Sequence, residues 1–463
     1  MKESTRSIWV LPGQSESAQE IVIRRALRIL PDTREVSEAS WRDREVVLKV
    51  FCHRWKARYH YWRELRGLRR LAELGFRAPV LLLSGRTRQG HWAIVTDKIQ
   101  EASTGLELWQ QAKSLEEKIE LLSHLARELA RHHRKGVVQS DLHMGNFMLR
   151  GQTVFSLDVA QISFKGRALG RRASVRDLAS FLSCLSEDKA CGIAPVAGAY
   201  AEERQWPWSP QDTEALTKRV YVIRREVIRK LVRRSLRTSG RTLRFREGRF
   251  RGVFERSFLA ESSPSQFCEA LDALLRQGGV LKNGKTCFVC RIVWNGHDVV
   301  VKRYNHKGFW HSLRHTLKGS RARRSWLNAQ LLGLLGIPTA QPLAYIDECR
   351  GFMLWQSCFI TAFIQARSLS HLMGDAQVVR STKEMRSRQV LQLLDRLADH
   401  RITHGDTKHS NFLLDADGAV LTDLDGMRVH RVYWTLRRRF NRELMRFARD
   451  CDWLEDHVKA RQR

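Results

Sequence analysis

The sequence predicts an α+β protein made of two tandem domains of one type. The main observation is an internal repeat, because residues 403–426, THGDTKHSNFLLDADGAVLTDLDG, have a counterpart in residues 138–158, VQSDLHMGNFMLRGQTVFSLD. In each copy, strand-like runs come first and a helical apolar pattern follows before the repeat. A length of 463 residues is sufficient for two domains with separate cores. We place the expected domains at residues 1–239 and 240–463.

Each copy contains an Asp, an Asn five residues later and a second Asp twelve residues after the Asn. These residues are Asp141, Asn146 and Asp158 in the first copy and Asp406, Asn411 and Asp423 in the second. The offset is 265 residues at all three positions (406 − 141, 411 − 146 and 423 − 158). This is the spacing of a phosphotransfer catalytic loop. It predicts two tandem protein-kinase-like domains, each with a small β-rich N-lobe and a mainly helical C-lobe.

The composition adds a strong positive charge, with 81 Lys and Arg against 49 Asp and Glu and a net charge of +32. Such a field attracts nucleic acid, an anionic membrane or a phosphorylated substrate. No RNA- or DNA-binding motif accompanies it, so we do not expect a nucleic-acid partner. The nine cysteines form no framework, and the CxxC of Cys287 and Cys290 has no second pair, which argues against structural zinc and favours reduced thiols. No signal-peptide pattern or long apolar run appears, so we expect a cytoplasmic protein that does not span a membrane.

In the first domain, residues 1–25 give no clear element, and strands are expected from residue 26 onward, with a turn at residues 31–32. Lys49 lies in the strand-like run VVLKVF. Helical spacing of Tyr61, Leu65 and Leu71 follows, and Glu64 lies on that helix. A strand Lys followed by a helix Glu is the arrangement of a nucleotide-binding N-lobe, in which the Glu orients the Lys.

After Asp158 there is no long activation segment, which argues against a protein kinase. Residues 217–237 then form a basic amphipathic pattern with nine Lys and Arg against one Glu. This pattern is typical of a helix at a membrane surface, or of a terminal helix packed on its own domain. We favour the packed helix, because the apolar stripe fills a core equally well.

In the second domain, strands are expected at residues 286–293 and 299–304, with Lys302 corresponding to Lys49. Ser325 falls where Glu64 falls in the first copy, whereas Gln139 of the first copy falls at His404 of the second. Neither copy has a GxGxxG loop, and the second offers only KNGK at residues 282–285. The stretch at residues 314–324 is dense in positive charge.

Phosphoryl transfer requires charge neutralisation and in-line positioning. Asp141 and Asp406 are the candidate catalytic residues, which would accept the hydroxyl proton. Lys49, Glu64, Lys302 and Lys408 are the candidate residues for binding ATP, with Lys408 placed to touch the γ-phosphate. The four oxygen ligands expected for Mg²⁺ are Asn146, Asp158, Asn411 and Asp423.

The motifs VVLKVF, WRELRGLRRLAELGF and SDLHMGN in the first copy, with VVVKRYN, SRARRSW, LGIPT and HGDTKHSNFLL in the second, resemble the lipopolysaccharide core (heptose and Kdo) kinase family. The resemblance covers nearly the whole chain, twice. It implies a kinase fold, ATP and Mg²⁺, and phosphorylation of an inner-core sugar hydroxyl at the cytoplasmic face of the inner membrane. The implied partners are lipopolysaccharide core or another anionic glycolipid, with peripheral contact to an anionic membrane.

The sequence departs from that family in its tandem fusion, in Ser325 and in Gln139. Two hypotheses follow from these departures. Either the protein is a sugar kinase with one or both domains active, or it is a partly or wholly degenerate scaffold that binds nucleotide or anionic glycolipid without turnover.

Overall fold

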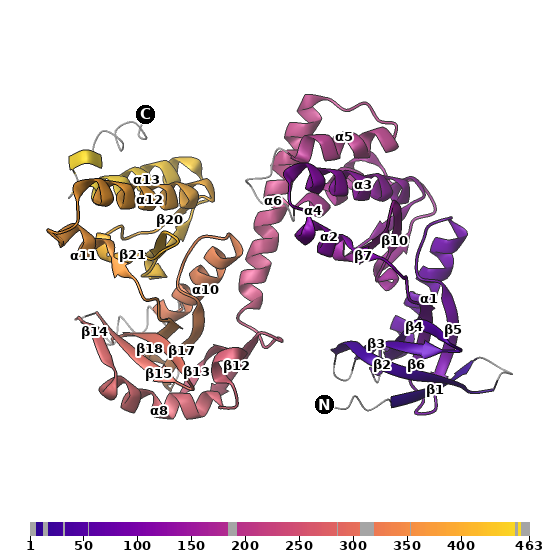
Figure 1. Cartoon of the computed structure of the whole chain (residues 1–463), viewed down its shortest axis with the longest axis horizontal. Helices are drawn as coiled ribbons and strands as arrows, with labels where there is room; N and C mark the ends of the chain where they lie inside the picture. The colour runs from indigo at the N-terminus through magenta and orange to yellow at the C-terminus, as the bar shows by residue number, and fades with distance from the viewer. Residues whose placement is uncertain are drawn as a thin grey trace. The chain divides into compact units, whose positions relative to one another are not determined.

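A computed structural model describes residues 6–12, 17–30, 33–53, 55–183, 192–284, 286–305, 319–351, 353–449 and 452–454. The turn expected at residues 31–32, Lys285 and residues 314–318 of the basic stretch lie outside these described residues. The chain divides into two compact units, residues 1–225 and 226–463, so the division falls within helix α6 (Pro210–Arg234). Figure 1 shows the elements of each unit. Their mixture of helix and strand agrees with the expected α+β class.

The first unit begins with a closed antiparallel barrel in the order β1-β2-β3-β4-β6-β5. Its strands are β1 (Arg6–Pro12), β2 (Gln19–Leu30), β3 (Arg34–Trp41), β4 (Arg44–Phe51), β5 (Leu81–Thr87) and β6 (Trp92–Asp97). Apolar side chains that alternate along these strands, such as Val46, Leu48 and Val50, fill the barrel. The expectation that residues 1–25 contain no clear element is wrong. Strand β1 pairs with both β2 and β5 and thereby closes the barrel.

Helix α1 (Ala57–Glu73) follows the barrel strand β4. Its predicted apolar face, which includes Tyr61, Leu65 and Leu71, packs in a second hydrophobic core to which the barrel strands also contribute. The rest of the unit is mainly helical. Its helices are α2 (Gly105–Gln111), α3 (Leu115–Arg134), α4 (Arg171–Leu182), α5 (Ile193–Glu203) and the start of α6. Small ribbons of β7 (Ser103–Thr104), β9 (Phe147–Arg150) and β10 (Thr153–Ser156), and of β8 (Val137–Gln139) and β11 (Ile162–Phe164), flank the loop that carries Asp141.

The second unit begins with an open seven-stranded antiparallel sheet in the order β12-β13-β17-β18-β16-β15-β14. The strands are β12 (Thr242–Glu247), β13 (Phe250–Glu255), β14 (Gly279–Asn283), β15 (Cys287–Trp294), β16 (His297–Tyr304), β17 (Pro342–Arg350) and β18 (Met353–Ala362). Among the described strands, the β12–β13 hairpin extends the sheet beyond β17 and does not pair with β14 at the opposite edge. The sheet therefore stays open where the first unit closes into a barrel.

Helices complete the second unit, namely α7 (Arg256–Leu259), α8 (Pro264–Gln277), α10 (Arg321–Leu334), α11 (Leu369–Gly374), α12 (Arg380–Asp399) and α13 (Tyr433–Ala448). The ribbons recur as β19 (Arg367–Ser368), β21 (Phe412–Leu414) and β22 (Ala419–Leu421), and as β20 (Ile402–Thr403) with β23 (Arg428–Val429). Cys287 and Cys290, the predicted CxxC pair, lie buried in strand β15 as free thiols.

Helix α6 is longer at its start than the predicted 217–237 and ends at Arg234. Leu216 and Val220 pack in the core of the first unit, as expected for a packed helix. The later apolar positions of this helix are not buried in the same way, because Val227 and Leu231 are both 39% exposed. The favoured interpretation therefore holds only for the first half of this helix.

Candidate functional site

In the first unit, the barrel strand β4 and helix α1 place Lys49 and Glu64 side by side. Their ammonium and carboxylate groups form an ion pair, with Glu64 almost fully buried. Because a buried carboxylate is costly without a partner, Lys49 is held to this one position by Glu64. The strand–helix tie predicted from the spacing is thus present in the structure.

The loop of the first unit is closed by hydrogen bonds between its own polar residues. The Asn146 side-chain amide donates to the carbonyl oxygen of Asp141 at 2.6 Å, and this orients the loop around Asp141. Gln139 donates to the carbonyl of Leu157 at 3.3 Å. The Asp141 side chain is 66% exposed, so it is open to an acceptor from solvent.

Asp158 has a left-handed backbone, with φ 47° and ψ 49°, which Asp tolerates better than most residues. Arg34, at the start of β3, lies 3.8 Å from its carboxylate. The next turn packs tightly on helix α1, because a Cβ at Gly67 would meet the Val159 carbonyl oxygen at 2.6 Å. A glycine is required at this contact, which holds helix α1 against the turn after Asp158.

The second unit repeats this loop, and His404 adds contacts to both of its ends. Asn411 donates to the carbonyl of Asp406 at 2.9 Å, the same bond as in the first unit. The ring nitrogens of His404 lie 3.0 Å from the Asp406 carbonyl and 2.9 Å from the Thr422 carbonyl. Leu157 is the counterpart of Thr422 in the 265-residue offset. Gln139 therefore makes the contact that His404 makes with the strand before the second Asp, although it replaces a histidine.

Two cations surround the Asp406 carboxylate. Lys408 lies 3.5 Å from one oxygen and Arg446, from α13, lies 3.2 Å from the other. In the first unit the residue at the Lys408 position is His143, 3.8 Å from Asp141. The two loops thus share a backbone arrangement and differ in the charge placed around the catalytic candidate.

The main difference between the units is the partner of the strand lysine. Lys302 forms an ion pair with Asp423, which like Asp158 has a left-handed backbone, with φ 59° and ψ 57°. Ser325, on α10, is buried and exchanges a hydrogen bond of 2.9 Å with the hydroxyl of Tyr304. The helix therefore offers no carboxylate to Lys302, and the lysine bonds the candidate metal ligand instead.

Helix α10 is tied to the second loop by other residues. Arg321 donates to Asp425 at 2.5 Å, and Asn328 donates to the Leu424 carbonyl at 2.7 Å. Burial raises the pKa of Asp425, and its hydrogen bond with Asp423 adds to this. Burial opposes ionisation of Asp423 too, but the hydrogen bond from Asp425 and the charge of Lys302 outweigh it and lower the Asp423 pKa. Of the two carboxyl groups, Asp423 therefore keeps its charge to the lower pH.

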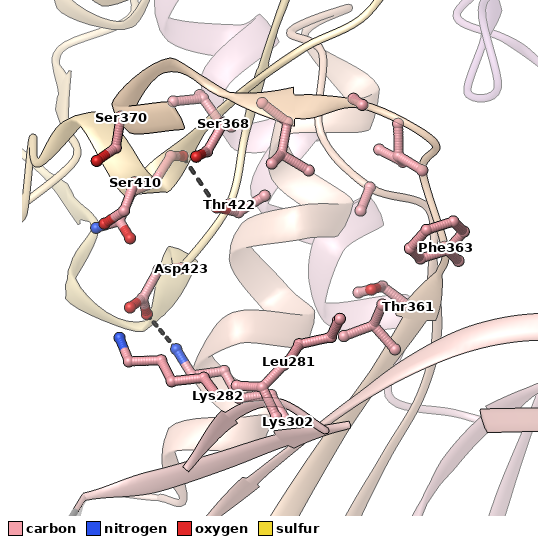
Figure 2. A pocket seen from close by; sticks show the side chains of 18 of the residues that line it. Leu281, Lys282, Lys302, Thr361, Phe363, Ser368, Ser370, Ser410, Thr422 and Asp423 are labelled. Atoms are coloured by element: carbon pink, nitrogen blue, oxygen red, sulfur yellow. Dashed lines mark hydrogen bonds and ion pairs between the residues drawn. The ribbon is translucent and has the colours of Figure 1, made fainter. Parts of the chain in front are cut away.

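A pocket of about 1210 Å³ opens between the sheet and the helical part of this unit, a size that accommodates a nucleotide. Figure 2 shows Lys282 and Lys302 extending from the sheet toward Asp423. Thr361 and Phe363 line the wall across from them, near the end of β18. The pocket thus combines two ammonium groups and the Asp423 carboxylate with a mixed lining, in which apolar side chains such as Phe363 alternate with polar ones such as Ser368 and Ser370.

Glu443, on helix α13, also holds the loop of the second unit in place. The two carboxylate oxygens of this buried residue accept the backbone N–H groups of His404, at 3.0 Å, and Gly405, at 2.6 Å. Burial raises the Glu443 pKa, against the effect of these N–H donors. Gly405 has a φ of 93°, and a Cβ there would meet the Gly426 carbonyl oxygen at 2.5 Å. Helix α13 thereby fixes the backbone immediately before Asp406.

Several residues of this site were not predicted from the sequence: Arg34, Arg321, Asp425, Glu443 and Arg446. Asp425 had a signal, because it is two residues from Asp423 in TDLDG. Arg321 lies in the motif SRARRSW and in the basic stretch 314–324, but its bond to Asp425 was not predicted. Arg34, Glu443 and Arg446 come from a strand and a helix distant in sequence, and no motif marks them.

The donor set fits a hard divalent cation. In both loops the Asn amide nitrogen is used in the bond to the Asp carbonyl, which leaves the amide oxygen as a candidate ligand for a cation, together with the carboxylate of the second Asp of the motif. Within the described ranges no cluster of three or more His, Cys, Asp or Glu residues is placed to hold a metal by itself. An Asn–Asp pair completed by nucleotide phosphates is the arrangement that Mg²⁺ commonly adopts.

Comparison with known proteins finds one family match within each of the two units. The model of the lipopolysaccharide kinase (Kdo/WaaP) family matches residues 14–221 and again residues 274–460. A search of curated proteins found no match. In the part of the chain that the structure describes, no helix is sufficiently long and apolar to cross a membrane.

Proposed function

Because the chain belongs to the lipopolysaccharide kinase (Kdo/WaaP) family, with both halves matching its model, we propose that it transfers the γ-phosphoryl group of ATP to a sugar hydroxyl of the lipopolysaccharide inner core. The observation that carries the proposal is the repeated loop. In both units an Asn side chain is bonded to the carbonyl of the Asp before it, and the second Asp adopts a left-handed backbone. A strained backbone retained at the same position twice is typical of a functional site.

In this proposal each unit is a protein-kinase-like domain, with its β-rich part as the N-lobe and its helical part as the C-lobe. In the reaction, the acceptor hydroxyl oxygen forms a bond to the γ-phosphorus, and the bond from that phosphorus to the β,γ-bridging oxygen breaks to release ADP. Asp141 and Asp406 orient the hydroxyl and take its proton. Lys49 and Lys302 hold the phosphates of the nucleotide. Bound Mg²⁺ would neutralise phosphate charge between Asn146 and Asp158, and between Asn411 and Asp423.

The two sites differ in the partner that holds the strand lysine. In the first unit Lys49 is already oriented by Glu64 and leaves Asp158 without a lysine partner. In the second, Lys302 is bonded to Asp423, the residue that would hold the cation. The Lys302–Asp423 pair is the one observation that supports a second candidate function for the second unit, which is nucleotide binding without turnover. We place the protein at the inner face of the inner membrane, where its substrate is made.

The test is phosphate mapping by mass spectrometry on dephosphorylated core oligosaccharide with Mg-ATP. The variants are Asp141→Asn, Asp406→Asn and both together, with Asp417→Asn in an exposed turn as the control. We expect wild type and the control to add phosphate and the double variant to add none. Loss in one single variant only assigns the reaction to that unit. If wild type adds no phosphate while a known core kinase does, the kinase proposal is wrong and the binding role replaces it.

A further inference from the structure

The exposed face of helix α13 carries a row of arginines that ends at the second catalytic candidate. Leu436, Leu444 and Phe447 face the core, which leaves the opposite side of the helix in solvent. Arg438, Arg442 and Arg446 are all exposed and are spaced by four residues, so they lie along one side of the helix. Arg446 contacts the Asp406 carboxylate at 3.2 Å. A continuous positive stripe therefore leads to the place where an acceptor hydroxyl would bind.

The other end of this stripe is apolar. Tyr433 and Trp434 begin the helix and are both 65% exposed, and Val432 just before them is 57% exposed. Arg438 places its guanidinium 5.6 Å from the centre of the Trp434 ring. Exposed Trp and Tyr beside arginines are typical of surfaces that lie in the headgroup region of a bilayer. From Trp434 to Arg446 the helix rises about 18 Å.

The charge of helix α13 indicates what kind of partner its exposed face binds. Helix α13 has five arginines and a single acid, Glu443, which is buried and bonded to the loop. Its exposed surface is therefore purely cationic in side-chain charge, and it complements an anionic surface. The lower half of α6 is also basic and partly apolar, but its exposed apolar residues are Val222, Val227 and Leu231, with no Trp or Tyr among them.

We propose that Val432, Tyr433 and Trp434 insert into the surface of an anionic lipid bilayer, and that Arg438, Arg442 and Arg446 guide the phosphorylated head of a lipid-anchored saccharide to Asp406. The second part rests on the proposed function of this unit. The first part, membrane docking through the start of α13 (Figure 1), is independent of that proposed function.

The experiment is flotation of the full-length protein with vesicles of phosphatidylcholine, with or without phosphatidylglycerol, without ATP or acceptor. We expect wild type to float with the anionic vesicles and to be released by salt. Replacement of Tyr433 and Trp434 by Ser should remove most of this binding. Replacement of Arg438 and Arg442 by Gln should weaken vesicle binding about 30-fold, because the attraction of two basic residues to the anionic surface is lost.

The matched control replaces Arg276 and Arg388 by Gln, two exposed arginines on α8 and α12 that change the net charge equally. This variant should float as wild type does. Because all four arginines are on the surface, the Gln variants test the proposal even if the aromatic variant folds poorly, which circular dichroism reports. The proposal is wrong if wild type does not float, if the α13 variants float unchanged, or if the control loses as much binding. A defect in phosphate transfer affects none of these results.

Discussion

Lys302 pairs with Asp423, whereas its counterpart Lys49 pairs with Glu64. The same lysine position is thus satisfied by a helix carboxylate in one unit and by the candidate metal ligand in the other. The replacement of a glutamate by Ser325 explains the difference, because Ser325 is occupied by the Tyr304 hydroxyl and has no charge to offer. The following predictions test what these contacts do.

Replacing Lys302 by Met should destabilise the second unit in a pH-dependent way. The pKa of Asp423 is lowered from 3.8, so the pair contributes stability above about pH 4 and loses it as the pH falls further. We expect a loss of about 1–3 kcal/mol at pH 7, which shrinks in acid. Hydrogen exchange by mass spectrometry measures this, and peptides of the first unit are the internal control. An equal loss at every pH would contradict the assigned pair.

Replacing Glu64 by Ser should give the first unit a serine where the second unit has one, so that the helix no longer offers a carboxylate to the strand lysine. Lys49 would lose its buried partner, at a cost of about 3–5 kcal/mol. The control is Glu73→Ser, because Glu73 forms an exposed pair with Arg70 that is worth at most about 1 kcal/mol. Hydrogen exchange in the peptides of helix α1 separates the two. If both variants behave alike, the Lys49–Glu64 pair does not hold the helix.

Replacing Lys282 by Met should weaken nucleotide binding in the second unit. We expect ATP affinity to fall about tenfold or more, since hydrogen bonds to charged groups are worth about 1.5–3 kcal/mol. Adenosine, which lacks phosphates, should bind unchanged. Competition with a fluorescent nucleotide, in a Lys49→Met background that silences the first unit, measures both. Arg388→Met removes an equal charge outside the pocket and should have no effect. Equal losses for ATP and adenosine would place Lys282 elsewhere than at the phosphates.

Replacing Glu443 by Gln should loosen the loop before Asp406. A carboxamide has one acceptor oxygen, so the N–H of either His404 or Gly405 would face an NH₂ group. The expected cost is about 1–3 kcal/mol. Faster hydrogen exchange in residues 402–411 would report it. Glu269→Gln, on the exposed face of α8, is the control. Unchanged exchange in this loop would show that helix α13 does not hold it.

Replacing Gly405 by Ala should have a larger local effect than replacing Gly374. The added methyl would meet the Gly426 carbonyl oxygen, and the positive φ of Gly405 disfavours any Cβ. At Gly374 no atom lies within 4 Å of the added Cβ. Thermal unfolding should therefore shift down for Gly405→Ala only. A shift for both variants, or for neither, would contradict the close approach of the two loop segments.

The sequence by itself determined the features that depend on short separations. The Asp–Asn–Asp spacing, which recurs after 265 residues, and the apolar face of helix α1 are patterns within one loop or one element. Contacts over such short separations follow from backbone geometry, which is why Asn146 and Asn411 both bond the carbonyl of the Asp five residues before them. The Lys49–Glu64 pair, over 15 residues, also belongs to this class.

Only the tertiary structure decided the contacts between distant segments. Strand β1, in a stretch without clear pattern, closes the first barrel because its backbone pairs with β2 and β5, and backbone pairing requires no side-chain motif. Lys302 and Asp423 are 121 residues apart, and Glu443 reaches Gly405 from another helix. Partners at that separation are selected by how the elements pack, because a buried charge bonds whichever group of opposite charge or hydrogen-bonding capacity the fold places beside it.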